Sequence, residues 1–557
     1  MNKVNQSKRW HKSYKLGRYQ LAQSLAPYPE LPLFTILDES ASGNPLATAI
    51  DYYGMKLNYE ELKNECDSLA AALAQLGLKR GDKVVTILPT CPQYIISTFA
   101  ILKTGAAHVP CGNLHQGPEL QYQINESGAE TVIGLAEHLS CIESIKPTTK
   151  IRNIILTSLK DYTAEQPGNL EPVKGIYQFR QLIAAHKPQP PEVEIDPKND
   201  LAYLAFTGGA TGRPRGVMLT HYNRLSNVLQ GLPWTTANHA ESIRGRASVI
   251  IAVPLFHLYG DWVMLTAIYL GFKIILVQDP RDIDSILELM VEKRPFMVSI
   301  VPTQLMKLCQ KDIPTQPVHI MSGSSYLPVA VCESVSQKTR KPVSDGYGLT
   351  EASPVTHIDL TGFSKTTGCI GVPVPDTDVK LINEETGLEC AVGEAGHMYI
   401  KGPQVMKGYW PNPGDGLTDG WLPTGDIARM NEDGCFFIVD RLKDMVNISG
   451  YKVYTSVIDD ILFRHPAVSM AVSIGVPDPE RPGSERIKAF IQLKEQFKNK
   501  VSATEIISYC KKKCPPYAVP KFVEFREHLP LTATQKLFKR KLREEEMNKA
   551  AKGNSNQ

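Results

Sequence analysis

The sequence lacks several signatures of common nucleotide-binding and metal-binding proteins. No Gly-Lys dipeptide occurs in its 557 residues, which excludes the phosphate loop of Walker-type NTPases because that loop ends in Gly-Lys-Ser/Thr. No Gly-x-Gly-x-x-Gly run supports a nicotinamide-binding Rossmann site. The 11 cysteines include no Cys-x-x-Cys pair, so we expect reduced, structural thiols in a cytoplasmic protein, with neither a zinc site nor a disulfide framework.

Long hydrophobic runs and an excess of one charge are also missing. The longest uncharged apolar stretch, residues 262–272, falls short of the roughly 18 residues that a membrane-spanning helix needs. A formal net charge of +3 spread over the chain leaves no nucleic-acid footprint. We therefore expect a multidomain globular protein that has no nucleic-acid partner.

One basic segment stands out at the N-terminus, residues 1–30. Its first acidic residue is Glu30, and Trp10, Tyr14 and Tyr19 are interleaved among its basic residues. The basic residues are Lys3, Lys8, Arg9, Lys12, Lys15 and Arg18. A solvated tail is the simpler interpretation. The alternative is that residues 1–20 rest on an anionic membrane surface, so that the protein is membrane-associated.

Two sets of alternating strand and helix patterns follow the basic segment. The first set has strand patterns at 83–88, 108–110 and 131–134, with helical patterns at 93–102 and 119–126. The second set has strand patterns at 247–253, 272–277, 296–301 and 317–321, with a helical pattern at 284–293. Such alternation is typical of parallel sheets covered by helices. We predict an α/β protein whose large domain contains two doubly wound halves.

The pattern changes near residue 366. Short alternating runs broken by Gly and Pro, from about 366 to 440, predict a small β-barrel-like subdomain. A charged turn at 441–444 then leads into a compact α+β segment. We predict a large domain over 31–442 and a small mobile C-terminal domain over 443–557, with the hinge at Lys443.

The most informative motif follows the apolar run 201–206. It reads Thr207-Gly208-Gly209-Ala210-Thr211-Gly212-Arg213-Pro214-Arg215-Gly216. Glycines let backbone N–H groups close around phosphate oxygens, threonine hydroxyls add donors, and arginines supply positive charge. The motif predicts a cradle for a nucleotide triphosphate, and an ordinary surface loop is the alternative.

Two further motifs carry groups suited to a nucleotide. Tyr347-Gly348-Leu349-Thr350-Glu351 offers an aromatic ring for a purine, with a hydroxyl and a carboxylate for phosphate and magnesium. Trp421-Leu422-Pro423-Thr424-Gly425-Asp426 presents a carboxylate on a tight turn, suited to ribose hydroxyls. Each motif alone is weak evidence, because structural turns have similar compositions.

Together and in this order, the motifs resemble the adenylate-forming superfamily of acyl-CoA synthetases, luciferases and peptide-synthetase adenylation domains. The resemblance spans about residues 35–545 and is closest to bacterial long- and medium-chain fatty acid CoA ligases. Further matching motifs are Pro254-Leu255-Phe256-His257, Ser322-Gly323, Leu327-Pro328, Asp345-Gly346-Tyr347, Gly402-Pro403-Gln404-Val405-Met406, Asp440-Arg441-Leu442-Lys443-Asp444, Ser449-Gly450-Tyr451-Lys452-Val453 and Lys536.

The resemblance implies a reaction in two steps. A carboxylate first attacks the α-phosphate of ATP, giving an acyl-adenylate and pyrophosphate, and the thiol of CoA then displaces AMP. Lys536, Thr350 and Glu351 would be catalytic, with Glu351 and Thr207 at a Mg²⁺ ion. The implied ATP- and AMP-binding residues are Thr207, Gly208, Gly209, Ala210, Thr211, Gly212, Arg215, Ser322, Gly323, Ser324, Asp345, Gly346, Tyr347, Gly348, Asp426, Ile438 and Arg441.

The resemblance also implies where the other two substrates bind. The acyl pocket would be formed by His257, Tyr259, Gly323 and Gly348, although a histidine beside aromatic residues is often a packed core residue. Asp261 and Tyr326 are unusual near this pocket and would shorten or polarise it. Rotation about Lys443 would bring the CoA-binding residues to the site for the second step. They are Ser449, Gly450, Tyr451 and Lys452.

The sequence departs from the family pattern at a few positions. Ala210 removes a hydroxyl from the phosphate loop, and Arg215 replaces the usual lysine while keeping its charge. Gln535 stands where a glycine usually precedes the catalytic lysine. We expect Ala210 and Arg215 to reduce triphosphate binding without abolishing it, and a positive φ at Gln535 would cost roughly 1 kcal/mol.

We therefore predict an AMP-forming fatty acyl-CoA synthetase, a monomer or homodimer that uses ATP, Mg²⁺ and coenzyme A. Three alternatives stay open at this point. The acid is branched, cyclic or aromatic, the acyl group passes to a carrier protein, or the chain is a degenerate nucleotide- or acyl-binding protein.

Overall fold

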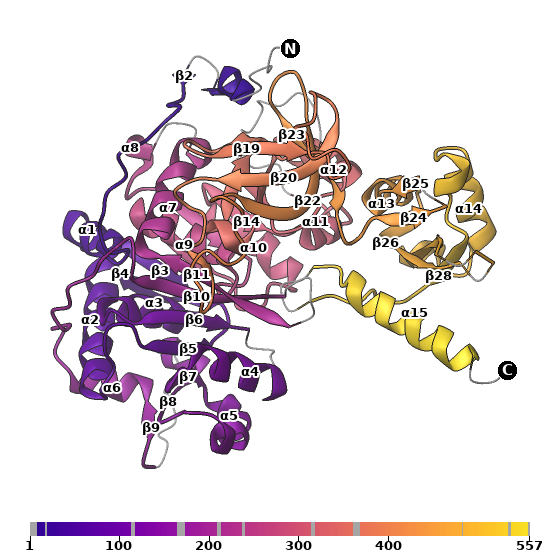
Figure 1. Ribbon diagram of the computed structural model, residues 1–557. Coiled ribbons are helices and arrows are strands. Elements are labelled where there is room, and N and C mark those ends of the chain that lie inside the picture. Colours follow the sequence, from indigo (N-terminus) through magenta and orange to yellow (C-terminus); the bar gives the residue numbers. More distant parts are fainter. Residues whose placement is uncertain are drawn as a thin grey trace.

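The computed structural model describes residues 8–16, 19–112, 117–163, 173–208, 213–236, 240–313, 318–359, 368–449, 451–478, 480–481, 483–532 and 536–554. A large domain carries a smaller C-terminal unit at its right-hand side in Figure 1. Two large sheets with helices around them and one small antiparallel sheet make up the large domain. This architecture confirms the predicted α/β class.

The first half is built on an eight-stranded sheet with a parallel centre. Apolar residues fill its central strands, which are buried on both faces, and the whole of helix α3 is buried as well. The strand order is β21 (Gly408–Tyr409), β11 (Pro214–Thr220), β10 (Leu201–Gly208), β6 (Ala107–Cys111), β5 (Lys83–Ile87), β7 (Thr131–Leu135), β8 (Asn153–Thr157) and β9 (Ile176–Gln178). The helices of this half are α2 (Tyr59–Gln75), α3 (Pro92–Lys103), α4 (Gly117–Ser127), α5 (Leu139–Ile145) and α6 (Phe179–Ala185).

The second half is built on a nine-stranded sheet, again parallel at its centre. Its order is β18 (Val372–Pro373), β17 (Val355–Ile358), β16 (Val343–Gly348), β15 (His319–Ser322), β14 (Met297–Ile300), β12 (Ser248–Ile251), β13 (Lys273–Leu276), β3 (Thr48–Tyr52) and β4 (Met55–Asn58). The helices of this half are α1 (Thr35–Gly43), α7 (His221–Thr235), α8 (Ala240–Ile243), α9 (Leu258–Tyr269), α10 (Ile283–Lys293), α11 (Pro302–Leu308) and α12 (Val329–Thr339). The carboxyl ends of β15 and β16 carry two of the predicted nucleotide motifs.

The small sheet is antiparallel, with the order β19 (Asp378–Ile382), β20 (Ala395–Lys401), β22 (Leu422–Met430) and β23 (Phe436–Arg441). Its outer strands β19 and β23 are not paired with each other in this order, so the four strands form an open sheet where we expected a barrel-like subdomain. Alternate residues of β19 are buried, as expected for a sheet with one solvated face.

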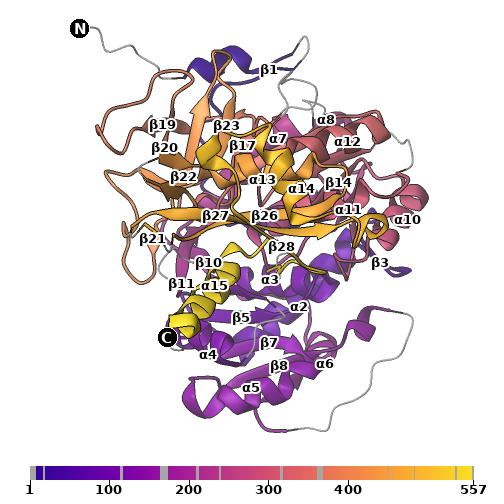
Figure 2. The ribbon, with the colours of Figure 1, turned by 90° about the vertical axis from the view of Figure 1, so that its right-hand side faces the viewer.

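The C-terminal unit is α+β. Its strands are β24 (Val446–Ile448), β25 (Tyr451–Val453), β26 (Val468–Pro477), β27 (Glu485–Leu493) and β28 (Phe522–Phe525), and its helices are α13 (Thr455–Phe463), α14 (Ala503–Lys511) and α15 (Lys539–Asn554). Figure 2 views this unit face on, in front of the large domain. Lys443, the expected hinge, lies between β23 and β24.

The N-terminal segment corrects the expectation of a solvated tail. Trp10 and Tyr14 are buried, at 3% and 0% exposure, and Trp10 packs edge-on against Phe436 of the small sheet. The Tyr14 hydroxyl donates to the carbonyl of Pro373 at 2.6 Å. A Cβ atom on Gly434 would lie 2.4 Å from the Cα of Trp10, so the fit is close.

Among the described residues, no helix is long and apolar enough to cross a membrane.

Candidate functional site

The phosphate-loop motif spans a β-hairpin at the edge of the first sheet. Thr207 and Gly208 end β10, and Arg215 pairs with Thr207 at the start of β11. The loop residues Gly209, Ala210, Thr211 and Gly212 lie outside the described residues. The Arg215 guanidinium lies 2.5 Å from a carboxylate oxygen of Asp415 and 3.5 Å from the ring centroid of Tyr409. Arg215 therefore has a counter-charge and an aromatic contact before any phosphate binds.

Glu351 lies on the short turn that follows β16. The hydroxyl of Tyr409 donates to Glu351 Oε1 at 2.7 Å, and the N–H of Met406 donates to the Glu351 carbonyl at 2.8 Å. Gly348 is required just before this turn, because a Cβ atom there would lie 2.0 Å from the carbonyl oxygen of Pro354. Arg215, Tyr409 and Glu351 thus form a continuous set of contacts that joins the hairpin to the Thr350–Glu351 turn.

Tyr347, Asp426 and Arg441 form the second group. The Tyr347 hydroxyl donates to Asp426 Oδ2 at 2.5 Å, and Arg441 Nε lies 3.3 Å from Asp426 Oδ1. Burial, together with the charge of Asp426, raises the pKa of Tyr347 well above its ordinary value. Gly425 has φ +75°, which favours glycine at the turn that presents Asp426. Ile438 lies on β23, the neighbouring strand.

The end of β15 and the segment after it contribute buried hydroxyls that have no protein partner. The side-chain oxygens of Ser322 and Ser324 are buried without a hydrogen bond in the structure. Unpaired buried hydroxyls are costly unless a ligand or water satisfies them. Gly323 lies between them. A Cβ atom on Gly323 would lie 3.2 Å from the carbonyl oxygen of Gly346. Burial raises the pKa of the nearby Asp345 carboxyl well above its usual range.

Lys536 reaches this region from the C-terminal unit, and Figure 1 shows the chain before α15 extending back toward the large domain. Its Nζ lies 3.3 Å from Nε2 of His257. Burial, with a contribution from the Arg441 charge, lowers the pKa of Lys536 to about 7, while Asp426 and Glu351 act in the opposite direction. The lysine therefore lies within the electrostatic reach of the groups on β22, β23 and the Glu351 turn.

His257 and Tyr259 begin helix α9. His257 caps the helix, since its Nδ1 accepts the N–H of Tyr259 at 3.3 Å. Burial and the neighbouring Lys536 lower the pKa of His257 well below its ordinary value, so the ring is neutral. The buried Tyr259 donates its hydroxyl to the carbonyl of Met321 at 2.8 Å and lies against Gly323.

The structure corrects the expected effect of Asp261. Asp261 and Arg224 form an ion pair, and both side chains are fully buried. The hydroxyls of Tyr203 and Tyr94 also donate to Asp261, at 3.0 and 3.3 Å. The second Arg224 nitrogen donates to the carbonyl of Ser353, just after the Thr350–Glu351 turn. Asp261 is therefore balanced within the core instead of polarising an acyl pocket.

The predicted CoA-binding residues lie on the β24–β25 hairpin of the C-terminal unit. The N–H of Ser449 donates to the Ser484 hydroxyl at 3.0 Å, Tyr451 stacks on Tyr517, and Lys452 Nζ lies 2.6 Å from Glu385 of the large domain. Gly450 is outside the described residues. None of these contacts involves the groups around Lys536, so the structure brings together the described residues of the predicted ATP site but not the predicted CoA-binding residues.

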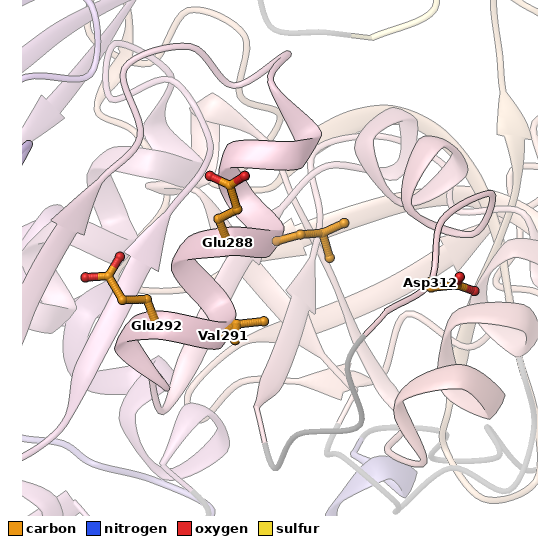
Figure 3. A pocket seen from close by; sticks show the side chains of 5 residues that line it. Glu288, Val291, Glu292 and Asp312 are labelled. Carbon is orange, nitrogen blue, oxygen red and sulfur yellow. The ribbon is translucent and has the colours of Figure 1, made fainter.

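A surface groove beside α10 lies away from these groups. It is lined by Leu287, Glu288, Val291, Glu292 and Asp312. Figure 3 shows Val291 on the side of α10 that faces Asp312, with Glu288 and Glu292 on the same helix. Its three carboxylates make the groove unfavourable for an anionic ligand.

Three contacts could not be found by sequence reasoning. Each is a polar contact between segments that are distant in the sequence. They are Tyr409 with Glu351, His397 with the N–H of Gly425, and His257 with Lys536. The only sequence signal was the position of Tyr409 three residues after the Gly402–Met406 motif.

Comparison with known proteins agrees with this arrangement. Residues 37–410 match the AMP-binding enzyme family, and residues 457–536 match the AMP-binding enzyme C-terminal domain. The long-chain-fatty-acid–CoA ligase of Bacillus subtilis (strain 168) is 36% identical over 546 residues, with 93% of this chain and 95% of the relative covered. The enzyme of that name from Salmonella typhimurium is 34% identical over 522 residues, with 88% and 90% covered.

A solved anthranilate CoA ligase in complex with anthranoyl-AMP has a TM-score of 0.83 and 25% identity, with 95% of this chain and 99% of that chain covered. The two matched family regions include Glu351, Tyr347 and Lys536, whereas Asp426 and Arg441 lie between them. The chain therefore belongs to the AMP-binding enzyme family and is an AMP-forming acid–CoA ligase, whose substrates are a carboxylic acid, ATP and CoA.

Proposed function

We propose that the carboxylic acid is a medium- or long-chain fatty acid and that Lys536 acts in forming the acyl-adenylate. The contact that carries the proposal is the 3.3 Å approach of Lys536 Nζ to His257 Nε2. It joins the lysine of the C-terminal unit to the first residue of the expected acyl pocket. The relatives that are 32–36% identical over most of the chain carry the name long-chain-fatty-acid–CoA ligase, which supports the choice of acid.

Charge neutralisation is the central requirement of the first step, because the carboxylate and the triphosphate are both anionic. Lys536 would bridge the attacking carboxylate and the α-phosphate. Both substrates would raise the pKa of this lysine and keep it protonated. Removing one stabiliser of this kind typically slows a reaction on the order of 100- to 1000-fold.

The nucleotide would lie across the ends of β15, β16 and β22. Tyr347 would stack on adenine beside the Ser322–Ser324 segment, whose two unpaired hydroxyls would gain partners. Asp426 and Arg441 would bind the ribose hydroxyls, and the β10–β11 hairpin would hold the terminal phosphates. Since the Tyr347 hydroxyl already orients Asp426, little rearrangement is needed.

Magnesium fits this site through a single protein carboxylate. Among the described residues, no group of three His, Cys, Asp or Glu side chains could hold a metal ion. Mg²⁺ commonly binds through one or two carboxylates plus substrate phosphates, and Glu351 with Thr207 would supply the protein oxygens. The bound ion would neutralise phosphate charge. Tyr409 would fix the direction of the Glu351 carboxylate through its hydrogen bond.

The acyl chain would follow one face of α9. Tyr259, Val263 and Ala267 lie four residues apart, so they share a helix face. A small, mostly apolar cavity lies beside this helix. It is lined by Val263, Ala267, Leu270 and Phe296, among others. The rise from Tyr259 to Ala267 is about 12 Å. Each buried CH₂ would contribute about 0.8 kcal/mol, or roughly fourfold in selectivity.

An acid panel tests this proposal. Linear acids of increasing length, with branched, cyclic and aromatic acids, are scored by pyrophosphate release and thioester formation. We expect kcat/KM to rise with chain length. We expect Ala267→Leu to lose the longest acids while it keeps the short ones, because the added atoms would fill the cavity.

Val291→Leu, on the outer face of α10, is the matched control and should not change the preference. A best substrate that is aromatic, or a chain-length profile that Ala267→Leu leaves unchanged, would refute the fatty acid assignment.

A further inference from the structure

Helix α12 receives its N-terminal cap from the other domain. Its own N-cap residue, Pro328, provides no side-chain acceptor. Asp460 of α13 supplies one instead, because its Oδ1 accepts the N–H of Val329 at 3.1 Å. The first N–H groups of a helix have no partner within the helix, and a carboxylate there also interacts favourably with the helix dipole. Figures 1 and 2 both show α13 beside α12.

The same helix α13 also holds the segment that carries Lys536. Asp459, next to Asp460, accepts a hydrogen bond from Lys539 Nζ at 3.0 Å. Lys539 begins α15, three residues after Lys536. Lys539 also donates to the Thr455 hydroxyl at 2.8 Å, at the start of α13. Two adjacent carboxylates therefore connect α12 of the large domain to the lysine segment.

The two carboxylates differ in what they depend on. The contact of Asp459 with Lys539 lies within the C-terminal unit and does not depend on how that unit sits. The contact of Asp460 crosses between the domains. Its partner, Val329, lies five residues after Ser324 of the predicted nucleotide site. Asp460 also pairs with Arg464 on its own helix at 3.3 Å, an interaction that is independent of the large domain.

We propose that Asp460 is a positioning residue for the first half-reaction, which docks the C-terminal unit so that Lys536 reaches the acid and the α-phosphate. This proposal rests on the proposed role of Lys536. In this structure the cap forms together with the approach of Lys536 to His257, so it stabilises that arrangement. Loss of a helix cap typically shifts such an equilibrium about fivefold.

Several other polar contacts cross the same boundary. Beside the hinge, the buried Asp440 carboxylate accepts from the hydroxyl of Thr455 at 3.0 Å and from the N–H of Ser456 at 3.4 Å. Gln310 with Ser469 at 3.0 Å and Glu385 with Lys452 at 2.6 Å cross the boundary as well. Both join solvent-exposed side chains, whose contacts contribute little. The Asp460 carboxylate is only 20% exposed and accepts from a backbone N–H that has few alternatives. Asp460 is therefore better shielded from solvent than these two contacts, and it contributes more to docking than either of them.

Separate assays of the two half-reactions test the proposal. The full-length enzyme is given acid and ATP without CoA for pyrophosphate release, and preformed acyl-adenylate with CoA for thioester formation. Asp460→Ala should slow the first about fivefold and leave the second unchanged or faster. Asp460→Asn, whose amide oxygen still accepts a hydrogen bond, should recover part of the rate.

Two control variants separate docking from helix stability. Arg464→Ala removes the ion pair but keeps the cap, and should leave both rates unchanged. Asp282→Ala removes an equivalent cap within the large domain, where the Asp282 carboxylate accepts the N–H of Ser285 of α10 at 3.0 Å. This variant should not slow one half-reaction selectively. Equal slowing of both half-reactions by Asp460→Ala, or slowing of neither, would overturn the proposal.

Lys536→Ala distinguishes this failure from that of the proposed function. If Lys536→Ala abolishes adenylate formation while Asp460→Ala has no effect, only the docking role is refuted. If Lys536→Ala leaves adenylate formation intact, the assignment of the lysine fails, and the docking proposal fails with it.

Discussion

Removing the charge of Asp261 should destabilise the large domain strongly. Asp261 and Arg224 are both fully buried, so Asp261→Asn leaves the guanidinium in the core without its counter-ion. Breaking a buried ion pair from one side costs about 3–5 kcal/mol. The side chain keeps its size and shape in this variant, so no cavity adds to the loss. We expect the free energy of unfolding of the large domain to fall by this amount.

Urea unfolding followed by tryptophan fluorescence measures the effect, because Trp262 is fully buried and adjacent to Asp261 in the chain. The double variant Arg224→Met with Asp261→Leu is the informative control. Replacing both partners by apolar residues is often neutral or stabilising, although two tyrosine hydroxyls lose their acceptor. The double variant should therefore be more stable than the sum of its single variants predicts.

The same variants decide between two roles for Asp261. If this residue lined the acyl pocket, as its sequence position suggested, Asp261→Asn would change the acid preference and leave stability nearly intact. A loss of stability below about 1 kcal/mol, the net value of an ordinary hydrogen bond, would refute our reasoning. Our reasoning would also be refuted if the stability losses of the single variants Arg224→Met and Asp261→Leu simply added up in the double variant.

Two further predictions concern Lys536 and the N-terminal segment. The pKa of Lys536 is lowered to about 7 in the free enzyme, so kcat/KM for ATP should fall as pH rises above about 7. The kcat value reports on the substrate-bound enzyme and should persist to higher pH. A flat kcat/KM profile between pH 7 and 9 would contradict this. Trp10→Ala should release residues 9–16, since truncating a buried tryptophan typically costs about 3–5 kcal/mol. Hydrogen exchange should then accelerate in this segment and around Phe436, with Lys12→Ala as the matched surface control; unchanged exchange would show that Trp10 does not hold the segment.

Periodicity predicted the two parallel sheets well because strands buried on both faces leave a strong signal. The runs at 83–88 and 131–134 became β5 and β7 within a residue or two. Motif chemistry likewise predicted a group that the structure brings together, including Tyr347, Asp426 and Lys536. Such motifs are short and local, so their residue types alone indicate the chemistry they serve.

The docked N-terminal segment and the interdomain cap could not be predicted in this way. Basic residues interleaved with aromatic ones are equally typical of tails, membrane contacts and packed segments, and only the partner surface at Gly434 and Phe436 decides among them. Asp460 carries no sequence signal at all, because a carboxylate in mid-helix usually faces solvent. Both features depend on surfaces that exist only after folding.

The docking of the N-terminal segment also has a consequence for synthesis. Ser13 donates to the carbonyl of Asp433, 420 residues later in the chain. At about 5–20 residues per second, the ribosome completes this partner surface roughly 20–80 s after the segment itself emerges. Trp10 and Tyr14 therefore leave the ribosome well before the surface that buries them exists, and they stay accessible to chaperones throughout that interval.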